Sequence, residues 1–431
     1  MTSSTIVRDV VAWESLDSRG TPTVACEVVL TGGSGRAVVP SGASTGRHEA
    51  RELRDGGERY GGRGVRAAVA SVTGELADAV RGLDAADQDA LDHALRAADS
   101  SPALARLGSN AVLAVSVAAA AGVASARRLP LWRSVAGEVA GPTLPMPMVN
   151  ILSGGAHAGR AVDVQDFLVV PLAARSFAEA IEWAWRVRRG TAELVDDAGL
   201  GATLVADEGG LGPRLPTNRA ALELLVRGME RAGLRPGEDV AVAIDVAATQ
   251  LVDPGGAGYR LSAENRTVGA EEWLEELAGW CTEFPVVSVE DPLGEDDWSG
   301  WALASRRLGG IQLLGDDLFV TDGDRLRRGI EAGIANAVLV KPNQTGTISD
   351  ARRVVLQARA AGMATVLSAR SGETEDCWLA DLAVGWSTGQ IKVGSTMRSE
   401  RTAKWNRLLE IEARWGDVVP FAGAGGLALT R

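Results

Sequence analysis

Hydrophobic and polar positions along the first third of the chain predict a small region of mixed α and β structure. Residues 23–30 alternate between apolar and polar positions and lead into Gly32-Gly33, which is typical of a strand that ends in a turn. Apolar residues recur with helical spacing near residues 65–81 and 110–128. The second stretch is rich in alanine, and its flanking charges favour a buried packing helix over a membrane segment.

Residues 141–147 contain three prolines and a glycine, and they interrupt this pattern. We therefore expect an α+β capping domain over residues 1–140 and a catalytic domain over 141–431. After Val149 the chain repeats a short apolar run, one or two polar residues and a longer helical stretch, which predicts an α/β fold with a (β/α)8 barrel. The expected strands are residues 164–170, 202–205, 240–244, 286–289, 311–314, 337–340, 364–367 and 390–391.

Charged residues follow most of these expected strands. At the carboxyl ends of barrel strands such residues become neighbours, although they lie far apart in the sequence. Capping of the next helix would explain one of them, but a succession of strands with this pattern favours a shared site. The residues are Asp207, Glu208, Asp245, Glu290, Asp291, Asp316, Asp317, Lys341, Arg370 and Lys392.

Three of these carboxylates indicate a magnesium site. Asp245, Glu290 and Asp316 follow three successive expected strands, and carboxylates that face one point repel each other unless a cation lies between them. Oxygen ligands without histidine or cysteine favour Mg²⁺ over zinc. Lys341 and Lys392 follow at later strands, and we expect the neighbouring cations and metal to lower the pKa of Lys341 enough for a general base.

Lysine is rare in this chain, which otherwise takes its positive charge from arginine. The lysines are Lys341, Lys392 and Lys404. Arginine stays charged in proteins, whereas a partly buried lysine can give up its proton. The retained lysines are therefore expected to do what arginine cannot, such as removing a proton beside a carboxylate.

Several long stretches match motifs of one family. They are residues 17–24, 40–46, 207–210, 288–292, 315–318, 341–344, 370–376 and 398–401. By these motifs the chain resembles the enolase (phosphopyruvate hydratase) family along nearly its whole length. The resemblance implies an enolase-like (β/α)8 barrel with an N-terminal α+β capping domain, two Mg²⁺ sites per chain, a small phosphorylated carboxylic acid such as 2-phosphoglycerate or phosphoenolpyruvate as substrate, and a homodimer or higher homo-oligomer.

The resemblance also implies a role for each site residue. Lys341 would take the C2 proton, and Glu208 would be the acid that helps the C3 hydroxyl to leave. Ser44 would join a second Mg²⁺ with the substrate phosphate, and the first Mg²⁺ would be held by Asp245, Glu290 and Asp316. Substrate contacts would come from Arg370 and Ser371 at the phosphate, Lys392 at the carboxylate, Gln165, and the mobile-loop histidine His157.

Two positions depart from the family pattern, on the side of the pocket that the resemblance assigns to the C3 hydroxyl. Ala369 stands where enolases have histidine, and Asp166, a further candidate catalytic residue, stands where they have glutamate. Both changes shorten the side chain. Because an imidazole that assists proton transfer commonly contributes a rate factor of about 10²–10⁴, its loss favours a specialised enzyme.

The sequence leaves three functions open. In the first, proton abstraction and phosphate binding are kept, and an enlarged C3 pocket admits a second small-molecule nucleophile. This logic is similar to that of carboxyphosphonoenolpyruvate synthase, an enolase relative in natural-product biosynthesis. The second is an ordinary glycolytic phosphopyruvate hydratase, a lyase, in which a water molecule fills the space left by each shortened side chain. The third is a catalytically silent enolase-like binding protein, against which the retained acidic residues and Lys341 argue.

Composition narrows the classes of partner. The formal net charge of −12 argues against nucleic acid, because phosphate backbones demand clustered lysine and arginine. No run of apolar residues is long enough to span a bilayer. Residues 1–13 also lack a basic region followed by an apolar one, which a signal sequence would have. We therefore expect a cytoplasmic protein that binds small molecules.

Overall fold

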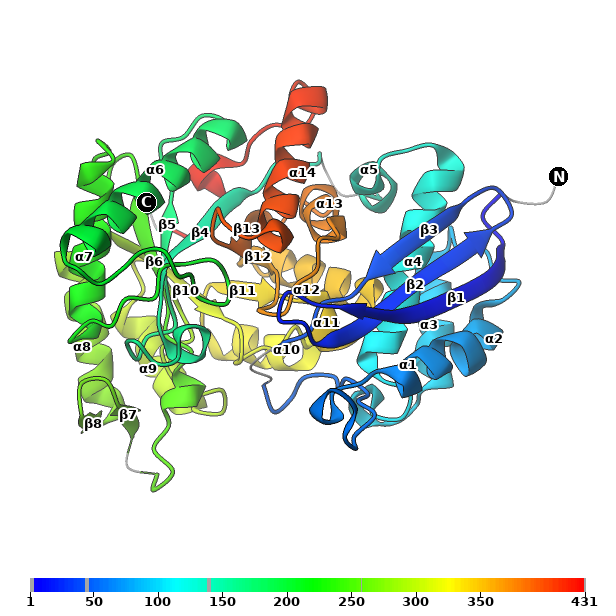
Figure 1. The fold of residues 1–431 in the computed structure, drawn as a ribbon, viewed down its shortest axis with the longest axis horizontal. Coiled ribbons are helices and arrows are strands. Elements are labelled where there is room, and N and C mark those ends of the chain that lie inside the picture. The colour runs from blue at the N-terminus through cyan, green and yellow to red at the C-terminus, as the bar shows by residue number, and fades with distance from the viewer. Residues whose placement is uncertain (1–3, 43–45, 138–140, 257, 430–431) are drawn as a thin grey trace.

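The computed structural model describes residues 4–42, 46–137, 141–256 and 258–429. In Figure 1 the N-terminal part, in blue and cyan, lies beside a barrel surrounded by helices. The barrel strands close on themselves in the order β10, β11, β12, β13, β4, β5, β6 and β9. The expected α/β fold, a barrel with an N-terminal α+β part, is confirmed.

The N-terminal part is an antiparallel sheet packed against helices. Its strands are β1 (Val7–Leu16), β2 (Pro22–Leu30) and β3 (Ser34–Val38), paired in that order. The sequence predicts only β2, because β1 shows no regular alternation of burial and β3 is short. The helices are α1 (Arg66–Ser71), α2 (Ala77–Val80), α3 (Gln88–Ala98), α4 (Ser109–Arg127) and α5 (Leu131–Val135), with a π-helical turn over Val72–Leu76 between α1 and α2.

Helix α4 packs closely on this sheet. A Cβ atom on Gly35 of β3 would lie 2.0 Å from the backbone nitrogen of Gly122 and 2.3 Å from the carbonyl oxygen of Ala118, so only glycine allows this contact. Helix α4 is long and apolar enough to cross a membrane, but 83% of its apolar stretch is buried inside the structure. It is a core helix, as its composition predicts.

The barrel is built from strands that alternate with helices through most of its length. The strands are β4 (Met146–Ser153), β5 (Asp166–Val170), β6 (Ala241–Asp245), β9 (Val286–Glu290), β10 (Gln312–Gly315), β11 (Ala337–Val340), β12 (Ala364–Ser368) and β13 (Gly389–Gly394). The helices are α6 (Phe177–Asp197), α7 (Asn218–Arg231), α8 (Ala270–Glu283), α9 (Trp298–Arg307), α10 (Gly323–Ala332), α11 (Pro342–Thr345), α12 (Ile348–Ala360), α13 (Trp378–Gly385) and α14 (Ser399–Trp415). A small hairpin of β7 (Tyr259–Leu261) and β8 (Arg266–Val268) follows β6.

Two strands differ from the sequence prediction. Strand β4 is missing from the prediction because Pro145 and Pro147 make its first residues resemble a linker. The strand expected over residues 202–205 is wrong, because these residues lie in the loop between α6 and α7. There Leu204 is 84% exposed, and only Val205 forms a bridge, with Leu211. A short apolar run without burial does not form a barrel strand.

Strand β5 runs opposite to the other strands of the barrel. It is antiparallel to both β4 and β6, whereas the other barrel pairs are parallel. The first residue of β5, Asp166, is therefore paired with Asp245, the last residue of β6. In an all-parallel barrel the start of a strand would lie at the opposite end from the mouth. The reversal brings Gln165 and Asp166 to the same end as the residues that terminate the other strands.

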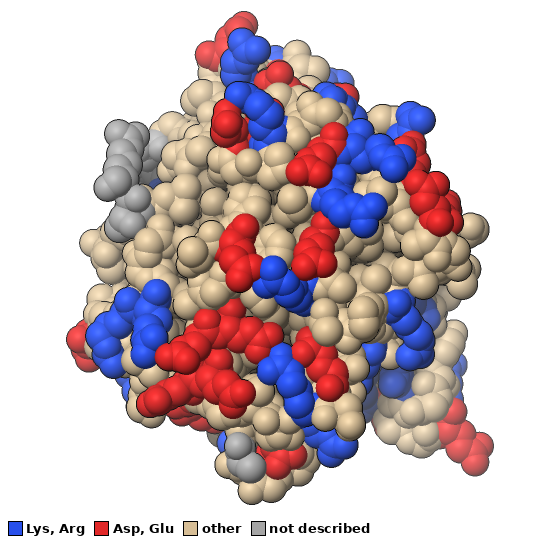
Figure 2. Space-filling view, turned by 90° about the vertical axis from the view of Figure 1, so that its left-hand side faces the viewer, with Lys and Arg blue, Asp and Glu red and all other residues tan. Residues whose placement is uncertain are grey.

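The outside of the barrel carries charges of both signs. Figure 2 shows acidic and basic side chains interleaved on one face. Pairs across one helical turn include Arg189 with Glu193 on α6 and Arg219 with Glu223 on α7. Exposed pairs of this kind contribute only about 0.3–0.5 kcal/mol each. The stability of the fold therefore depends mainly on its apolar core.

Lys404 is a structural residue of α14. Its side chain is 1% exposed, and its Nζ donates to Oε2 of Glu373 at 2.7 Å and to the carbonyl oxygen of Glu400 at 2.9 Å. This ammonium is paired with a buried carboxylate and with backbone carbonyl groups. These contacts support a structural role for Lys404 in joining α14 to the segment that follows β12.

Replacing Lys404 with methionine is expected to lower the free energy of unfolding by about 3–5 kcal/mol, because the carboxylate of Glu373 would stay buried without its partner. Urea unfolding followed by circular dichroism measures this loss. The double variant Lys404→Met with Glu373→Gln should recover much of it, because neither charge remains. A loss below about 1 kcal/mol in the single variant would contradict the buried pair.

Candidate active site at the barrel mouth

A polar cavity lies at the mouth of the barrel, where the strands meet the loops that follow them. Most of the site residues expected from the sequence line it, whereas Ser44 lies outside the described residues. The lining residues are His157, Gln165, Glu208, Asp245, Ala247, Gln250, Asp291, Asp316, Asp317, Lys341, Ser368, Ala369, Arg370, Ser371 and Lys392. Glu290 and Asp166 lie directly behind them, in contact with Lys392 and His157.

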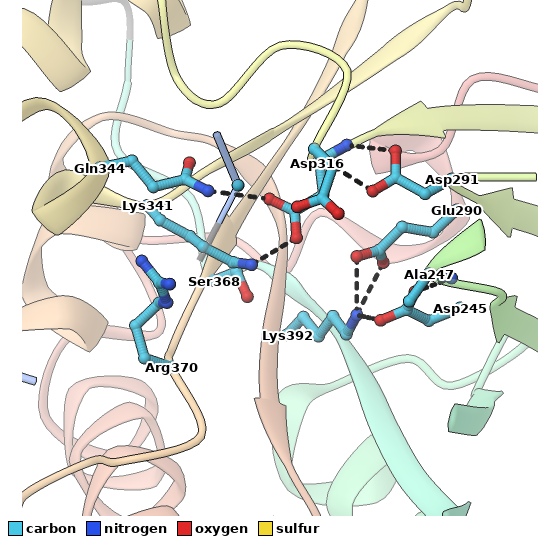
Figure 3. A network of polar contacts seen from close by, with 12 residues as sticks. Asp245, Ala247, Glu290, Asp291, Asp316, Lys341, Gln344, Ser368, Arg370 and Lys392 are labelled. Carbon is cyan, nitrogen blue, oxygen red and sulfur yellow. Dashed lines mark hydrogen bonds and ion pairs between the residues drawn. The ribbon is translucent and has the colours of Figure 1, made fainter. Parts of the chain in front are cut away.

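Lys392 of β13 joins two of the expected metal ligands. Its Nζ donates to Oδ2 of Asp245 at 2.7 Å and to both carboxylate oxygens of Glu290, at 2.7 and 2.8 Å (Figure 3). Burial disfavours the charged ammonium, but these two carboxylates outweigh burial and hold the pKa of Lys392 well above its usual range. Lys392 is therefore a fixed cation, suited to binding a carboxylate and not to removing a proton.

Lys341 follows β11 and contacts the third expected metal ligand, Asp316, through its Nζ (Figure 3). The sequence predicts a lowered pKa for Lys341, but in the structure the pKa is raised. Burial lowers it, and the carboxylates of Asp316 and Glu290 more than compensate. A cation bound to these carboxylates would remove the main cause of the rise. The base role of Lys341 therefore depends on how the charges of its acidic neighbours are balanced.

Asp316 also belongs to a second group of acids. Carboxylate oxygens of Asp291, Asp316 and Asp317 lie within 4.8 Å of one another. Asp291 accepts hydrogen bonds from the backbone N–H groups of Asp316 at 3.0 Å and Asp317 at 2.7 Å. Burial and the charge of Asp316 raise the pKa of Asp317 to about 7. Crowding of negative charge at this point is severe enough to favour protonation or a bound cation.

Arg370 follows β12 and is held by an acid from the N-terminal part. Its Nη1 donates to Oε2 of Glu49 and to Oδ1 of Asn343, both at 2.9 Å. The guanidinium is 4% exposed, and the neighbouring Ser371 is equally buried. A guanidinium that already holds one carboxylate in a buried site is a suitable binding group for a phosphate.

His157, which lines the cavity, forms a buried pair with Asp166 behind it. The Nδ1 of His157 lies 2.8 Å from Oδ2 of Asp166, and its Nε2 lies 3.9 Å from Oε1 of Glu208. The other oxygen of Asp166 accepts hydrogen bonds from Asn150 Nδ2 at 2.5 Å and Ser153 Oγ at 2.9 Å. Ala369, on the cavity wall, is buried and adds only a methyl group.

Gln165 is held in a short chain of amides. Its Nε2 donates to Oδ2 of Asp245 at 3.2 Å, and its Oε1 accepts from Nε2 of Gln250 at 3.0 Å. Sequence reasoning misses Gln250, because its contact depends on the 3-10 turn over Ala248–Leu251 that follows β6. It also misses Asn150 and Ser153, which lie on the unpredicted strand β4, and Glu49, whose contact spans the two parts of the protein. Of these residues, only Glu49 lies beside one of the quoted motifs, residues 40–46.

The donor set of this cavity fits a hard divalent cation. Carboxylates outnumber the basic side chains His157, Lys341, Arg370 and Lys392 among the lining residues and those directly behind them. Burial and neighbouring carboxylates raise the pKa of Glu290 and of Asp291 well above the usual range. The basic side chains nearby therefore do not fully balance the negative charge of the acids. Mg²⁺ prefers oxygen ligands of this kind. The acidic groups are therefore able to hold metal.

The fold and the cavity together define a class of protein, a barrel with an N-terminal α+β part and a charged site at the mouth, where barrel enzymes carry their active sites. A family model described as the enolase N-terminal domain matches residues 7–135, and one described as the enolase C-terminal TIM barrel domain matches residues 142–428. The chain therefore belongs to the enolase family. This membership indicates an enzyme of the lyase type.

Proposed function

We propose that this protein is a Mg²⁺-dependent enolase-family enzyme with a specialised C3 side. It removes the C2 proton from a small phosphorylated carboxylic acid of the 2-phosphoglycerate kind, releases the C3 hydroxyl, and admits a second small-molecule nucleophile at C3. The family supports the first part of the proposal. The second part rests on the shortened side chains of Ala369, on the cavity wall, and of Asp166, directly behind the lining residues.

The proposal of a specialised C3 side depends mainly on one observation, the contacts that hold the Asp166 carboxylate. Three contacts, with Asn150, Ser153 and His157, hold both of its oxygens behind the cavity. Ala369 adds only a methyl group to the wall. The family pattern has longer polar side chains at both positions, so the shorter side chains here would leave more space on the C3 side than histidine and glutamate do.

The other residues are assigned by their charge and position. Lys341 would take the C2 proton, and Lys392, a fixed cation, would bind the substrate carboxylate beside Gln165. A phosphate would replace the Glu49 carboxylate at Arg370, next to Ser371. Asp245, Glu290 and Asp316 would hold one Mg²⁺, and Ser44 a second. When bound, the metal would supply positive charge that stabilises the extra negative charge of the deprotonated substrate.

An ordinary phosphopyruvate hydratase is the second candidate. It is favoured by His157 and Glu208, which line the same cavity as Lys341 and keep proton-transfer groups on the C3 side. A catalytically silent binding protein is disfavoured, because it has no reason to keep mutually repelling buried carboxylates.

Incubation with 2-phosphoglycerate and Mg²⁺ in deuterated water separates the candidates. We expect deuterium to enter C2 at least about tenfold faster than phosphoenolpyruvate accumulates, because proton removal is intact and hydroxyl release is impaired. Proton NMR measures exchange, and ultraviolet absorbance measures the product. Excess EDTA should abolish both signals. Product formation as fast as exchange would establish the hydratase, and the lack of any exchange with Mg²⁺ present would defeat the proposal.

A further inference from the structure

We propose that a second cavity, between the N-terminal part and the barrel, binds a small organic anion with an apolar body, such as an aromatic carboxylate or sulfonate. The apolar body would lie on α4 and α12, and Arg127 and Arg352 would hold the anionic group. The described residues that line this cavity are all different from those that line the cavity at the barrel mouth. The inference is therefore independent of the chemistry proposed at C3.

The cavity has the size and the place of a ligand site. Its volume is about 510 Å³, and cavities that hold small molecules usually measure roughly 300–1,000 Å³. It lies where α12 of the barrel packs against α3 and α4 of the N-terminal part (Figure 1). The segment before α3, the end of α5 and the turn after α13 complete its lining. A molecule bound here would contact both parts of the protein.

One surface of the cavity is apolar. Ala120 and Val123 on α4, Ile348 on α12 and Trp386 after α13 line it, and each is at most 5% exposed. Leu356, one more lining residue of α12, is 40% exposed. Covering such a surface removes apolar area from water, which favours binding of an aromatic or aliphatic body.

Two arginines supply positive charge to the same cavity. Neither Arg127, in the last turn of α4, nor Arg352 of α12 forms an ion pair with a carboxylate of the described residues. The Nε atom of Arg352 is buried and has no hydrogen-bond partner among them, and its Nη2 donates only to the carbonyl oxygen of Ala136, at 3.4 Å. Buried donors normally have a partner, and a guanidinium matches a carboxylate or a sulfonate. These donors therefore point to an anionic ligand.

The acids that line the cavity are occupied elsewhere. Asp87 accepts a hydrogen bond from the backbone N–H of Ala90 at 3.0 Å and caps α3. Asp89 lies 3.6 Å from a nitrogen of Arg353, which also pairs with Asp350. The positive charge of the other two arginines is therefore not balanced by these acids, which favours an anion over a cation.

Contacts between helices hold the walls in place. The backbone N–H of Ser349 on α12 donates to Oδ2 of Asp92 on α3 at 3.0 Å, and Nε2 of Gln88 donates to the other oxygen of Asp92 at 3.0 Å. On the opposite side a Cβ atom on Gly137 would lie 2.4 Å from Nη2 of Arg352, so glycine lets the guanidinium lie against the backbone. A preformed cavity of this kind loses little conformational freedom on binding.

Methyl NMR tests the proposal, because the chain has ten isoleucines and Ile348 lines the cavity. The full chain, saturated with Mg²⁺ and labelled at isoleucine δ1 methyls, would be titrated with 2-naphthalenesulfonate. Ile348, identified with Ile348→Val, should shift and saturate. Ile244 and Ile391, which precede Asp245 and Lys392 at the barrel mouth, should not. Inorganic sulfate, and 2-naphthol, which is uncharged near neutral pH, should each bind at least about tenfold more weakly.

Several outcomes would overturn the proposal. Shifts confined to Ile244 and Ile391 would place the probe at the barrel mouth. Equal affinity for 2-naphthol or for sulfate would remove the need for the charge or for the rings. An Ile348 signal that moves with protein concentration, without any probe, would show that a second copy of the chain covers the cavity. The lack of a saturable shift at Ile348 would also refute the site.

Variants test the role of the arginines. Arg127→Gln and Arg352→Gln should each weaken binding of 2-naphthalenesulfonate by roughly 10–100-fold, the effect of losing a charged hydrogen bond, and leave 2-naphthol binding unchanged. Arg128→Gln is the matched control, because Arg128 is the next residue of the chain and does not line the cavity. It should leave both affinities unchanged. Full affinity for the sulfonate in both lining variants, or equal losses in the control, would refute the assignment.

Discussion

Replacing Lys341 with alanine is expected to slow exchange of the C2 proton by at least about 10²–10⁴-fold, the usual contribution of a positioned general base. Lys341 contacts Asp316 and lines the same cavity as Lys392 and Arg370. Lys392 cannot replace it, because two carboxylates hold that ammonium in its charged form. Deuterium incorporation at C2 of 2-phosphoglycerate, followed by proton NMR with Mg²⁺ present, measures the effect.

Lys341→Arg is the matched control for this experiment. Arginine keeps the positive charge beside Asp316 but does not give up its proton. Both variants should therefore lose exchange, although the arginine variant keeps the local charge balance and the alanine variant does not. Exchange that persists in either folded variant would show that another group is the base.

Restoring the family residues on the C3 side is the change with the second largest expected effect. The double variant Ala369→His with Asp166→Glu should raise phosphoenolpyruvate formation from 2-phosphoglycerate by roughly 10²-fold, because an imidazole returns to the wall and a longer carboxylate reaches toward the cavity. C2 exchange should change little, since Lys341 is untouched. Ultraviolet absorbance of the product and proton NMR of the substrate give the two rates.

Two further variants separate chemistry from volume. Ala369→Leu fills the same space without a group that transfers protons, so it should give no gain in product. Asp166→Glu alone keeps a carboxylate near His157 and should give at most part of the gain. If the double variant folds and its product formation is unchanged, positions 369 and 166 do not lie on the C3 side of the pocket.

The positions of the strand-end residues follow from the sequence, because a buried apolar run followed by a charge is a local pattern. Asp245, Glu290 and Lys341 are found in this way, and the structure brings their side chains to one end of the barrel. Direction of a strand is not a local property. The motif therefore locates Asp166, but the antiparallel course of β5 explains why it lies at the mouth.

Contacts between distant segments are the part that the sequence does not predict. The Asn150 and Ser153 contacts with Asp166 need the register of β4 against β5, and the Glu49 contact with Arg370 needs the packing of the N-terminal part on the barrel. The direction of the Lys341 pKa shift depends on the distance to Asp316, which composition does not give. The expected fall in this pKa assumes a metal beside Lys341, so it stays a prediction for the metal-bound protein.

The reversed course of β5 has a consequence for how this enzyme can change. Because β4 and β5 form a hairpin, the connection over residues 154–165 leaves and re-enters the barrel at the same rim. The loop that carries His157 can therefore change as one unit, while Lys341, Lys392, Asp245 and Glu290 stay on or beside other strands. Under the proposed function, such a change would alter the C3 side of the site and leave the residues assigned to C2 in place.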